Sequence, residues 1–594
     1  MTAHSRLTPA LVDSIREALT NSALPGETAD FSRDAQRTAA QFVADVAAQR
    51  QWGELAIHIE SSGGQAGHRR MRIAIVNDDM PFLVDSVANA IASRHLTIFR
   101  LLHPVVCVRR DEAGKLIAVE DFCDDRSRRE SIMYIELDRA DSRGRQELVT
   151  DLRRVLGDVT LAVRDWTKLQ QRMRSDAAAI PDPEGRALLE WFADGAMTLL
   201  GFHVEQPNRP YTESLGIFSV PGAPTDEGDC INAMNFLDRG GDNPLMAKAE
   251  RKSTVHRRVP LDLLVVPVLG DKGKIEGIGV HAGLWTSEAL RVPPEEVPVL
   301  RKRLKQLDAD FGFDPKGHSG KALRHAVASL PRDLLLTIDY QSLRSLVMMA
   351  MSLADRPRPG LLQVRSILKG QLFSFVWLPR EELTTARRTA IAMLLESEVG
   401  REVTSWSVEL GDGDLALIRY TQYIDEKAPQ PDAESLDAAV VEMVRGWAPA
   451  VEGELITVAG ATRATRLALT YINSFPDGYR ARTAPEEGAA DILRLCALSS
   501  DADRDVRISR FDHDAPEQLR LKTYRKGGLI PLSEAVPVLE NFGFRVLEEL
   551  PTALSGGQGY IHDFLVEVAD QAAMEALLTR TRPIERAIAN VLCG

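Results

Sequence analysis

The sequence MRIAIVNDDMPFLVDSV, residues 71–87, decides the fold of the N-terminal part of this chain. Its first six residues are mostly apolar, with alternation at the start, which predicts a strand. Residues 77–81 then form a turn, in which Asp79 is expected to cap the following helix and the proline to lie in its first turn. That helix carries apolar residues at helical spacing, at Leu83, Val87, Ala90 and Ile91.

The residues after this corner extend the unit. They predict a strand over Thr97–Arg109, a strand over Ser131–Leu137, a helix marked by Leu148–Leu156 and a closing strand over Thr160–Val163. The resulting order, βαββαβ, is that of a ferredoxin-like module. Its two helices cover one face of the sheet, so the other face needs a cover, often a second copy of the module.

Similar alternation of strands and helices continues along the chain. Strands are expected at Met197–Val204, Leu263–Val268 and Ile275–Leu284, interrupted by an acidic, glycine-rich loop over Pro221–Asp242. These strands predict a mostly antiparallel sheet domain. Two further modules are expected, one over Leu361–Tyr423 and one from Leu519 to Ile588, with helices over roughly 432–500 between them.

The sequence therefore predicts an α+β fold, in which several βαββαβ modules and one antiparallel sheet domain are joined by helical segments. The expected parts are an N-terminal helical segment, module 1, a helical connector with the sheet domain, helices with module 2, a helical segment and module 3. Their respective ranges are 1–52, 53–172, 173–310, 311–428, 429–502 and 503–594.

Composition narrows the function classes. The chain has 72 basic and 85 acidic residues, for a net charge of −13, which repels phosphate backbones and argues against nucleic-acid binding. The longest apolar stretch, Leu346–Ala354, is far shorter than the ~20 residues of a membrane span, and the N-terminus lacks a signal-peptide core. The five cysteines are far apart and form no CxxC pair, so we expect buried free thiols in a reducing, cytoplasmic compartment.

The chain carries no complete catalytic motif. No GxGxxG connects a strand to a helix, and no HExxH or GxSxG occurs. The near miss for a phosphate loop, Gly317-His-Ser-Gly-Lys-Ala322, has too few residues between its glycines and lacks the magnesium-binding hydroxyl. It is better explained as a loop before a helix capped by Ser319. No catalytic, cofactor-binding or metal-binding residue is therefore assigned.

The first strand–turn–helix corner is the best candidate for a binding site. Backbone N–H groups at a helix N-terminus favour an anion such as an amino-acid carboxylate, and nearby acidic or amide side chains could receive the ammonium group. The simpler alternative is that Asp79 only caps the helix and the other polar residues are solvated. The candidate effector-binding residues are Asn77, Asp78, Asp79, Met80, Pro81, Phe82 and Asp85.

At this point the sequence resembles a known family, the large bacterial NAD-specific glutamate dehydrogenases. The resemblance begins with DDMPFLVDSV at 78–87 and continues in the family's order over almost the whole chain. Its other segments are WFADG with LGF, STVHR, GLWTS, LPRD, PRE, FPDGY and LSEAVPVLE, at 191–195, 200–202, 253–257, 283–287, 330–333, 379–381, 475–479 and 532–540.

The resemblance implies that the modules are ACT-type, that the sheet domain is PAS-like, and that the chain corresponds to the N-terminal region of the family. It implies a parent reaction, the oxidation of L-glutamate by NAD to 2-oxoglutarate and ammonia. The family's catalytic lysine and aspartate and its NAD-binding glycines have no matching positions here, so we expect no cofactor in this chain and no activity from it alone.

For this chain the resemblance implies a regulatory and oligomerisation role, with a homo-oligomer, an amino-acid effector and its own catalytic domain or a downstream polypeptide as partners. The alternatives are a free-standing ACT-type amino-acid sensor that acts on a separate partner and, less favoured, an independent enzyme with a site assembled from distant residues.

Overall fold

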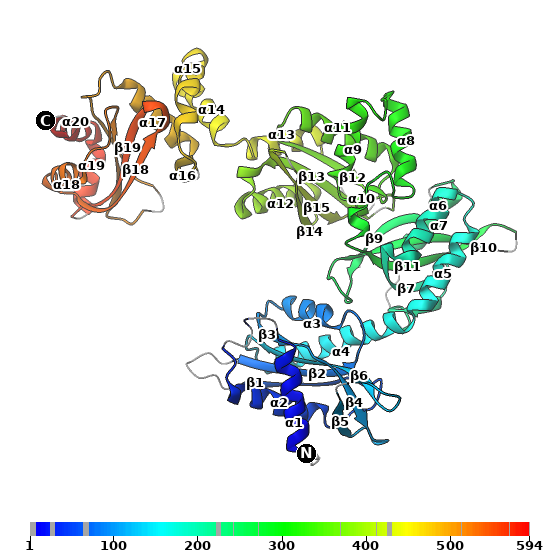
Figure 1. The fold of residues 1–594 in the computed structure, drawn as a ribbon. Coiled ribbons are helices and arrows are strands. Elements are labelled where there is room, and N and C mark those ends of the chain that lie inside the picture. Colours follow the sequence, from blue (N-terminus) through cyan, green and yellow to red (C-terminus); the bar gives the residue numbers. More distant parts are fainter. Residues whose placement is uncertain are drawn as a thin grey trace.

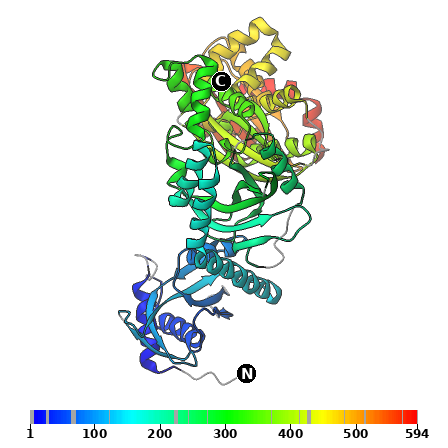
Figure 2. The same ribbon diagram turned by 90° about the vertical axis from the view of Figure 1, so that its right-hand side faces the viewer.

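The computed structural model describes residues 7–592, except 24–25, 27–29, 63–69, 121, 221–226, 242, 271, 369, 412, 425–430, 481, 512–513 and 570. Four antiparallel sheets, each with its own helices, follow one another along an elongated molecule (Figure 1). The N-terminal unit lies at one end and is joined to the rest by the long helices α4 and α5 (Figure 2). Among the described helices, none has the length and apolar content needed to cross a bilayer.

The first unit contains a sheet of order β1-β2-β6-β4-β5, with β3 also paired to β6. The strand expected over 97–109 is divided in two, and the strand expected over Thr160–Val163 is wrong, because these residues form the end of α4. Its elements are β1 (Ala56–Ser62), β2 (Arg70–Asp78), α3 (Leu83–Ala92), β3 (Ile98–Leu102), β4 (Val105–Arg110), β5 (Leu116–Glu120), β6 (Arg128–Leu137) and α4 (Ser142–Arg164).

Both faces of this first sheet are covered by the chain itself. On one face, residues such as Ile73 and Ile135 pack against α3 and α4. On the other, Ala74 and Tyr134 pack against α1 (Pro9–Asn21) and α2 (Arg33–Ala47). The N-terminal helices therefore cover the sheet face that was expected to need a cover such as a second copy of the module.

The second unit is a five-stranded sheet of order β8-β7-β11-β10-β9. The three strands expected from sequence are confirmed. The expected loop over 221–242 is wrong over 227–238, where a helix forms; 221–226 and 242 lie outside the described residues. The elements are α5 (Trp166–Ala179), α6 (Pro183–Trp191), η1 (Phe192–Ala196), β7 (Met197–Glu205), β8 (Thr212–Gly216), α7 (Glu227–Asp238), β9 (Leu245–Lys252), β10 (Pro260–Leu269), β11 (Ile275–Trp285) and η2 (Ala289–Arg291).

The third unit has the sheet order β12-β13-β15-β14. One face packs against α12 and α13, and the other packs through Phe373, Phe375 and Trp377 against the preceding helices. The near-miss phosphate loop begins α9, whose N-cap is Gly317; the prediction that Ser319 caps this helix is wrong. The elements are α8 (Leu300–Phe311), α9 (His318–Ala328), α10 (Arg332–Leu335), α11 (Tyr340–Asp355), β12 (Gly360–Arg365), β13 (Gln371–Pro379), η3 (Arg380–Glu382), α12 (Thr385–Val399), β14 (Val403–Leu410), β15 (Leu415–Tyr423) and α13 (Ala433–Met443).

The last unit follows a group of helices and has the order β16-β17-β19-β18. The strand at 505–509 was not expected, and two helices follow the last strand of the unit. The elements are α14 (Trp447–Ala459), α15 (Ala461–Tyr471), η4 (Ile472–Ser474), α16 (Asp477–Arg480), α17 (Pro485–Ala497), β16 (Asp505–Ser509), β17 (Gln518–Arg525), α18 (Leu532–Asn541), β18 (Arg545–Leu554), η5 (Ser555–Gly557), β19 (Gly559–Glu567), α19 (Gln571–Thr579) and α20 (Thr581–Leu592).

The first, third and fourth units share a topology. In each unit the chain first forms an outer strand and then the central strand that pairs with it. These antiparallel pairs are β1 with β2, β12 with β13 and β16 with β17. The order is therefore ββαββα, apart from extra strands in the first unit, and the predicted order βαββαβ is wrong in the position of this edge strand. An edge position can be filled from either direction of the chain, because pairing requires only a free row of backbone groups.

The expectation that all cysteines are free is wrong for two of them. Cys107 and Cys123 form a disulfide, with their Cα atoms 5.1 Å apart. The β4–β5 hairpin brings the chain back beside β4, so residues 16 apart in sequence become neighbours. Cys230 and Cys496 are free. Cysteine usage therefore no longer supports a reducing compartment, since disulfides are typical of oxidising ones.

Candidate functional site

The corner singled out from sequence joins β2 to α3. The residue before the helix is Phe82, whose φ of 71° lies in the left-handed region, and no side chain caps the helix. The expectation that Asp79 is the cap is therefore wrong. Its backbone N–H donates instead to the Arg129 carbonyl at 3.2 Å, and its carboxylate lies 3.4 Å from the Arg129 Nε.

Asp78 belongs to a buried ion cluster. The guanidinium of Arg50, whose side chain is fully buried, bonds both to Asp78 and, at 2.6 Å, to Glu130. Arg110 also bonds to Glu130, at 2.7 Å. The second carboxylate oxygen of Asp78 accepts the Gly53 N–H at 3.0 Å. Asp78 thus already has a cation and a donor, and the cluster ties β2 to the start of the first sheet.

The other side of the corner contacts the second unit through the loop at 253–257. The Asp85 carboxylate lies 2.9 Å from Nδ1 of His256, and the Phe82 ring centroid lies 5.2 Å from the His256 ring. The backbone of His256 is held at both ends, because its N–H donates to Ser86 Oγ at 2.8 Å and its carbonyl accepts from Asn89 Nδ2 at 2.6 Å. The corner is therefore a contact between units.

One polar group at this corner remains unsatisfied. Asn77 is 4% exposed, and its Nδ2 finds no hydrogen-bond partner among the described residues. Buried amide donors without a partner are rare and costly, so this atom marks the place where an acceptor would be favourable. The structure thus separates the predicted residues: Asp78 and Asp79 are paired with arginines, Asp85 with a histidine, and Asn77 keeps a free donor.

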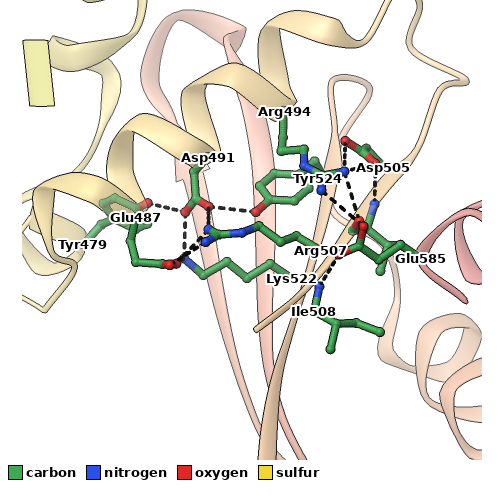
Figure 3. A network of polar contacts seen from close by, with 11 residues as sticks. Tyr479, Glu487, Asp491, Arg494, Asp505, Arg507, Ile508, Lys522, Tyr524 and Glu585 are labelled. Carbon is green, nitrogen blue, oxygen red and sulfur yellow. Dashed lines mark hydrogen bonds and ion pairs between the residues drawn. The ribbon is translucent and has the colours of Figure 1, made fainter. Parts of the chain in front are cut away.

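A second polar cluster lies between α17 and the last sheet (Figure 3). The Asp491 carboxylate is fully buried and accepts from Lys522 Nζ at 2.8 Å, from the Tyr524 hydroxyl at 2.7 Å and from the Tyr479 hydroxyl. Glu487, one turn earlier, bonds to Arg507 at 2.6 Å and to Lys522 at 3.3 Å.

The charges in this cluster balance. Two carboxylates face the cations Lys522 and Arg507, and burial together with Asp491 raises the pKa of Tyr524 well above its ordinary value, so that the phenol stays neutral. Burial lowers the pKa of Lys522, but Asp491 together with Asp563 and Glu487 outweighs burial, and the net shift is upward. Because each carboxylate already has its cation, the cluster is suited to fastening the helix to the sheet rather than to chemistry.

A neighbouring set of contacts extends this attachment to the C-terminal helix. Arg494 on α17 bonds to Asp505 at 3.0 Å and to Glu585 at 3.2 Å, and Glu585 accepts the Ile508 N–H at 2.8 Å (Figure 3). Sequence reasoning missed both sets, because residues 11 to 91 positions apart on different elements carry no local signal of pairing. No group of three or more His, Cys, Asp or Glu side chains able to hold a metal occurs within the described parts of the chain.

Comparison with protein families finds five models that match this chain, all from one enzyme. With the residues matched, they are the glutamate dehydrogenase ACT1 domain (17–152), helical motif 1 (297–356), ACT2 domain (370–448), helical motif 2 (454–498) and ACT3 domain (504–577). The ACT1 and ACT3 models contain all strands of the first and fourth sheets, and the ACT2 model contains the third sheet except β12. The helical motifs match α8–α11 and most of α14–α17.

Curated relatives agree with these models. The NAD-specific glutamate dehydrogenase of Halomonas elongata is 27% identical over 544 residues, which is 86% of this chain and 33% of the relative. That of Pseudomonas aeruginosa is 26% identical over 540 residues (86% and 33%), and that of Mycobacterium tuberculosis is 23% identical over 528 residues (83% and 32%). The chain spans about one third of the length of these relatives. By the five domains and their order, this chain belongs to the large bacterial NAD-specific glutamate dehydrogenases, in which it corresponds to the N-terminal region.

Proposed function

We propose that this chain is the N-terminal regulatory and oligomerisation region of a large NAD-dependent glutamate dehydrogenase. The parent reaction would convert L-glutamate, NAD and water to 2-oxoglutarate, ammonia and NADH, and the catalytic core with its NAD site would lie outside these 594 residues. The observation that carries the proposal is that the matched models are ACT domains and helical motifs of that one family, in sequence order. A cytoplasmic location, where NAD and glutamate are available, is part of the same proposal.

The finer domain assignment also belongs to this proposal. We retain the six parts expected from sequence, but place α13 with module 2, because Leu436 and Val440 pack into the core of that sheet. Three ACT-type modules would use a ferredoxin-like sheet in which the edge strand comes first. The order β8-β7-β11-β10-β9 supports a PAS-like second unit, since its first and last strands are central neighbours.

Within this assignment the corner at Asn77–Asp85 would bind an amino-acid effector. The unpartnered Nδ2 of Asn77 supports a carboxylate there, and the Asp85 side chain, which is 57% exposed, supports an ammonium group. Because Asp85 and Phe82 also contact His256, an amino acid bound at this corner would act on the contact between the first and second units.

Assembly is supported by the sheet edges. β14 and β18 are outer strands, and each exposes a large apolar side chain: Leu410 is 64% and Leu547 41% exposed. Outer strands with exposed apolar residues are ready sites for pairing with another chain. A homo-oligomer built through such edges would bring several copies of the catalytic core together.

Light scattering and calorimetry on the purified chain test the proposal together. Light scattering should give a mass of at least two chains, and titration with each of the twenty amino acids should give heat for at least one of them. A monomer that binds no amino acid would contradict the regulatory and oligomerisation role. A monomer that binds one would favour the free-standing sensor instead.

A further inference from the structure

A cavity of about 550 Å³ lies between the second unit and module 2. The second unit contributes the end of β9, the segment at 257–260 and the end of β11; module 2 contributes β13, β14 and β15. This volume falls within the range of roughly 300–1,000 Å³ that small-molecule sites occupy. It is too large for a lone inorganic anion and suits a small organic molecule.

The wall of this cavity is strongly cationic, although the chain as a whole carries a net charge of −13. Five basic side chains line it, against the two carboxylates of Asp262 and Asp333, and the five are Lys248, Lys252, Arg257, Arg258 and Arg419. A concentration of one sign of charge in a cleft attracts ligands of the opposite sign.

Two of the five cations already have partners. Lys248 is buried and lies 2.6 Å from Asp262 and 2.5 Å from Asp333, so its single charge faces two carboxylates. Arg419 lies 4.0 Å from Asp333 and also interacts with Glu409, which does not line the cavity. The positive charges of Lys248 and Arg419 are therefore nearly neutralised by these carboxylates, and they contribute little to the binding of an anion.

The other three cations are not neutralised. Lys252, Arg257 and Arg258 make no ion pair with any described carboxylate. Arg257 is held in place by a hydrogen bond from its Nη2 to the Trp285 carbonyl, and its Nε has no acceptor among the described residues. A guanidinium has five donors, so this side chain is fixed and still able to bind an anion.

Module 2 contributes an aromatic ring to the lining of the cavity. Trp406 on β14 lines the cavity and is 50% exposed, and the Arg388 guanidinium lies 4.1 Å from the centroid of its ring system. Next to the cavity the two units are joined by hydrogen bonds, from Tyr423 Oη to the Ala249 carbonyl at 3.0 Å and from Gln371 Nε2 to the Lys248 carbonyl at 2.8 Å. The cavity is therefore a built feature of the contact between units.

We infer that this cavity binds a small organic anion with two or more negative charges, carried by phosphate or carboxylate groups. Its charged end would lie against Lys252, Arg257 and Arg258, and its remaining part against Trp406. The ligand would touch both units at once, so its binding would favour one relative position of the second unit and module 2. The inference rests on this cavity alone and does not depend on the dehydrogenase assignment or on the corner at Asn77.

Calorimetry with the full 594-residue chain at low salt tests the inference. The probes are AMP and ADP as phosphates, succinate and citrate as carboxylates, and adenosine as the uncharged counterpart of AMP. At least one anion should bind with a Kd below about 1 mM and weaken as salt is added, while adenosine should not bind. Binding of AMP or ADP would identify a phosphate ligand, and binding of succinate or citrate would identify a carboxylate ligand. If none of the four anions binds, the inference is overturned.

Variants locate the site. The double substitution Arg257→Gln and Arg258→Gln should weaken the binding anion at least tenfold, and Lys252→Gln alone, at an exposed position, about threefold. Arg153→Gln, an exposed arginine on α4, is the matched control and should leave the Kd unchanged. Thermal unfolding checks that each variant is folded; should the double variant not fold, Lys252→Gln decides. Equal affinity of the wild-type chain and the folded cavity variants would overturn the inference.

Discussion

Lys522 on β17 donates to Asp491 on α17 at 2.8 Å, and both side chains are almost entirely buried. This ion pair is the centre of the contact by which the helices of helical motif 2 hold the ACT3 sheet (Figure 3). The two tyrosine hydroxyls that also donate to Asp491 complete its coordination. A charge buried with this many partners is costly to leave alone, which makes the contact specific.

Removing the carboxylate of Asp491 should therefore strongly destabilise the C-terminal part of the chain. Asp491→Ala leaves Lys522 buried without its closest anion, and we expect a loss of about 3–5 kcal/mol in the free energy of unfolding of the C-terminal part. Urea unfolding followed by tyrosine and tryptophan fluorescence measures it. Glu486→Ala, an exposed residue on the same helix, is the control and should change stability by less than about 0.5 kcal/mol. Equal effects of the two substitutions would show that the cluster does not fasten the helix.

The same cluster predicts an acid dependence. Burial raises the pKa of Glu487, but the hydrogen bonds and charges of Arg507 and Lys522 outweigh it, and the net shift is below the ordinary 4.5. A depressed carboxyl pKa stabilises the folded state above the unfolded value and loses this contribution as pH falls through the folded value. The stability difference between the wild-type chain and Glu487→Gln should thus be largest near neutral pH and shrink below about pH 4.5. A difference that stays constant from pH 7 to pH 3 would contradict this account.

At alkaline pH the cluster predicts the opposite dependence, in which the stabilisation is lost as pH rises. Burial lowers the pKa of Lys522, but Asp491 together with Asp563 and Glu487 outweighs burial, and the net pKa lies above the ordinary 10.5. A raised lysine pKa stabilises the folded state below the unfolded value, and the contribution disappears as pH rises through the folded value. Lys522→Met should therefore lose its destabilising effect only above about pH 10.5. Thermal unfolding at pH 8, 10 and 11 measures this, and a loss of the effect already at pH 8 to 10 would be inconsistent with the pairing.

The disulfide makes a direct chemical prediction. Cys107→Ser opens a loop of 16 residues and should reduce the stability of the first unit by about 3 kcal/mol under oxidising conditions. Cys496→Ser, at a free cysteine, should have a much smaller effect. Thiol labelling of the denatured, unreduced chain, read out residue by residue after proteolysis, should find Cys107 and Cys123 blocked, while Cys230 and Cys496 react. Reaction at Cys107 in that sample would show that the bond does not form.

The corner at the end of β2 can be tested by substitution. If an amino acid binds there, Asn77→Ala should weaken it about tenfold, because the unpartnered Nδ2 is the donor that a carboxylate would use. Asp125→Asn, an exposed position in the same unit, should leave affinity unchanged. Calorimetry gives both Kd values. Unchanged affinity in Asn77→Ala would move the amino-acid site elsewhere in the chain.

Periodicity predicted many of the central elements, and its failures have physical reasons. Ile275–Leu284 was expected as a strand and forms β11. Thr160–Val163 was expected as a strand because its residues favour one, but Val159 and Ala162 continue the buried helical stripe that starts at Leu148. Burial along one helix face outweighs local propensity when the stripe is this long.

The site was only partly visible in the sequence. The corner at 77–85 was located correctly as a strand–turn–helix connection, but its partners Arg50, Arg129 and His256 lie 28 to 171 positions away. The same applies to the cavity, whose cations without an ion pair, Lys252, Arg257 and Arg258, come from the second unit and whose Trp406 comes from module 2. Pairings between units depend on tertiary packing, and a single sequence carries no periodic signal for them.

The central claim is that this chain regulates and assembles a glutamate dehydrogenase whose chemistry lies elsewhere. NADH formation at 340 nm from L-glutamate and NAD, measured with the purified 594-residue chain, tests it most directly. The full-length Pseudomonas aeruginosa relative, assayed in parallel, is the positive control. The account predicts turnover by that relative and none above background by this chain. Sustained glutamate-dependent NADH formation that copurifies with this chain would contradict it.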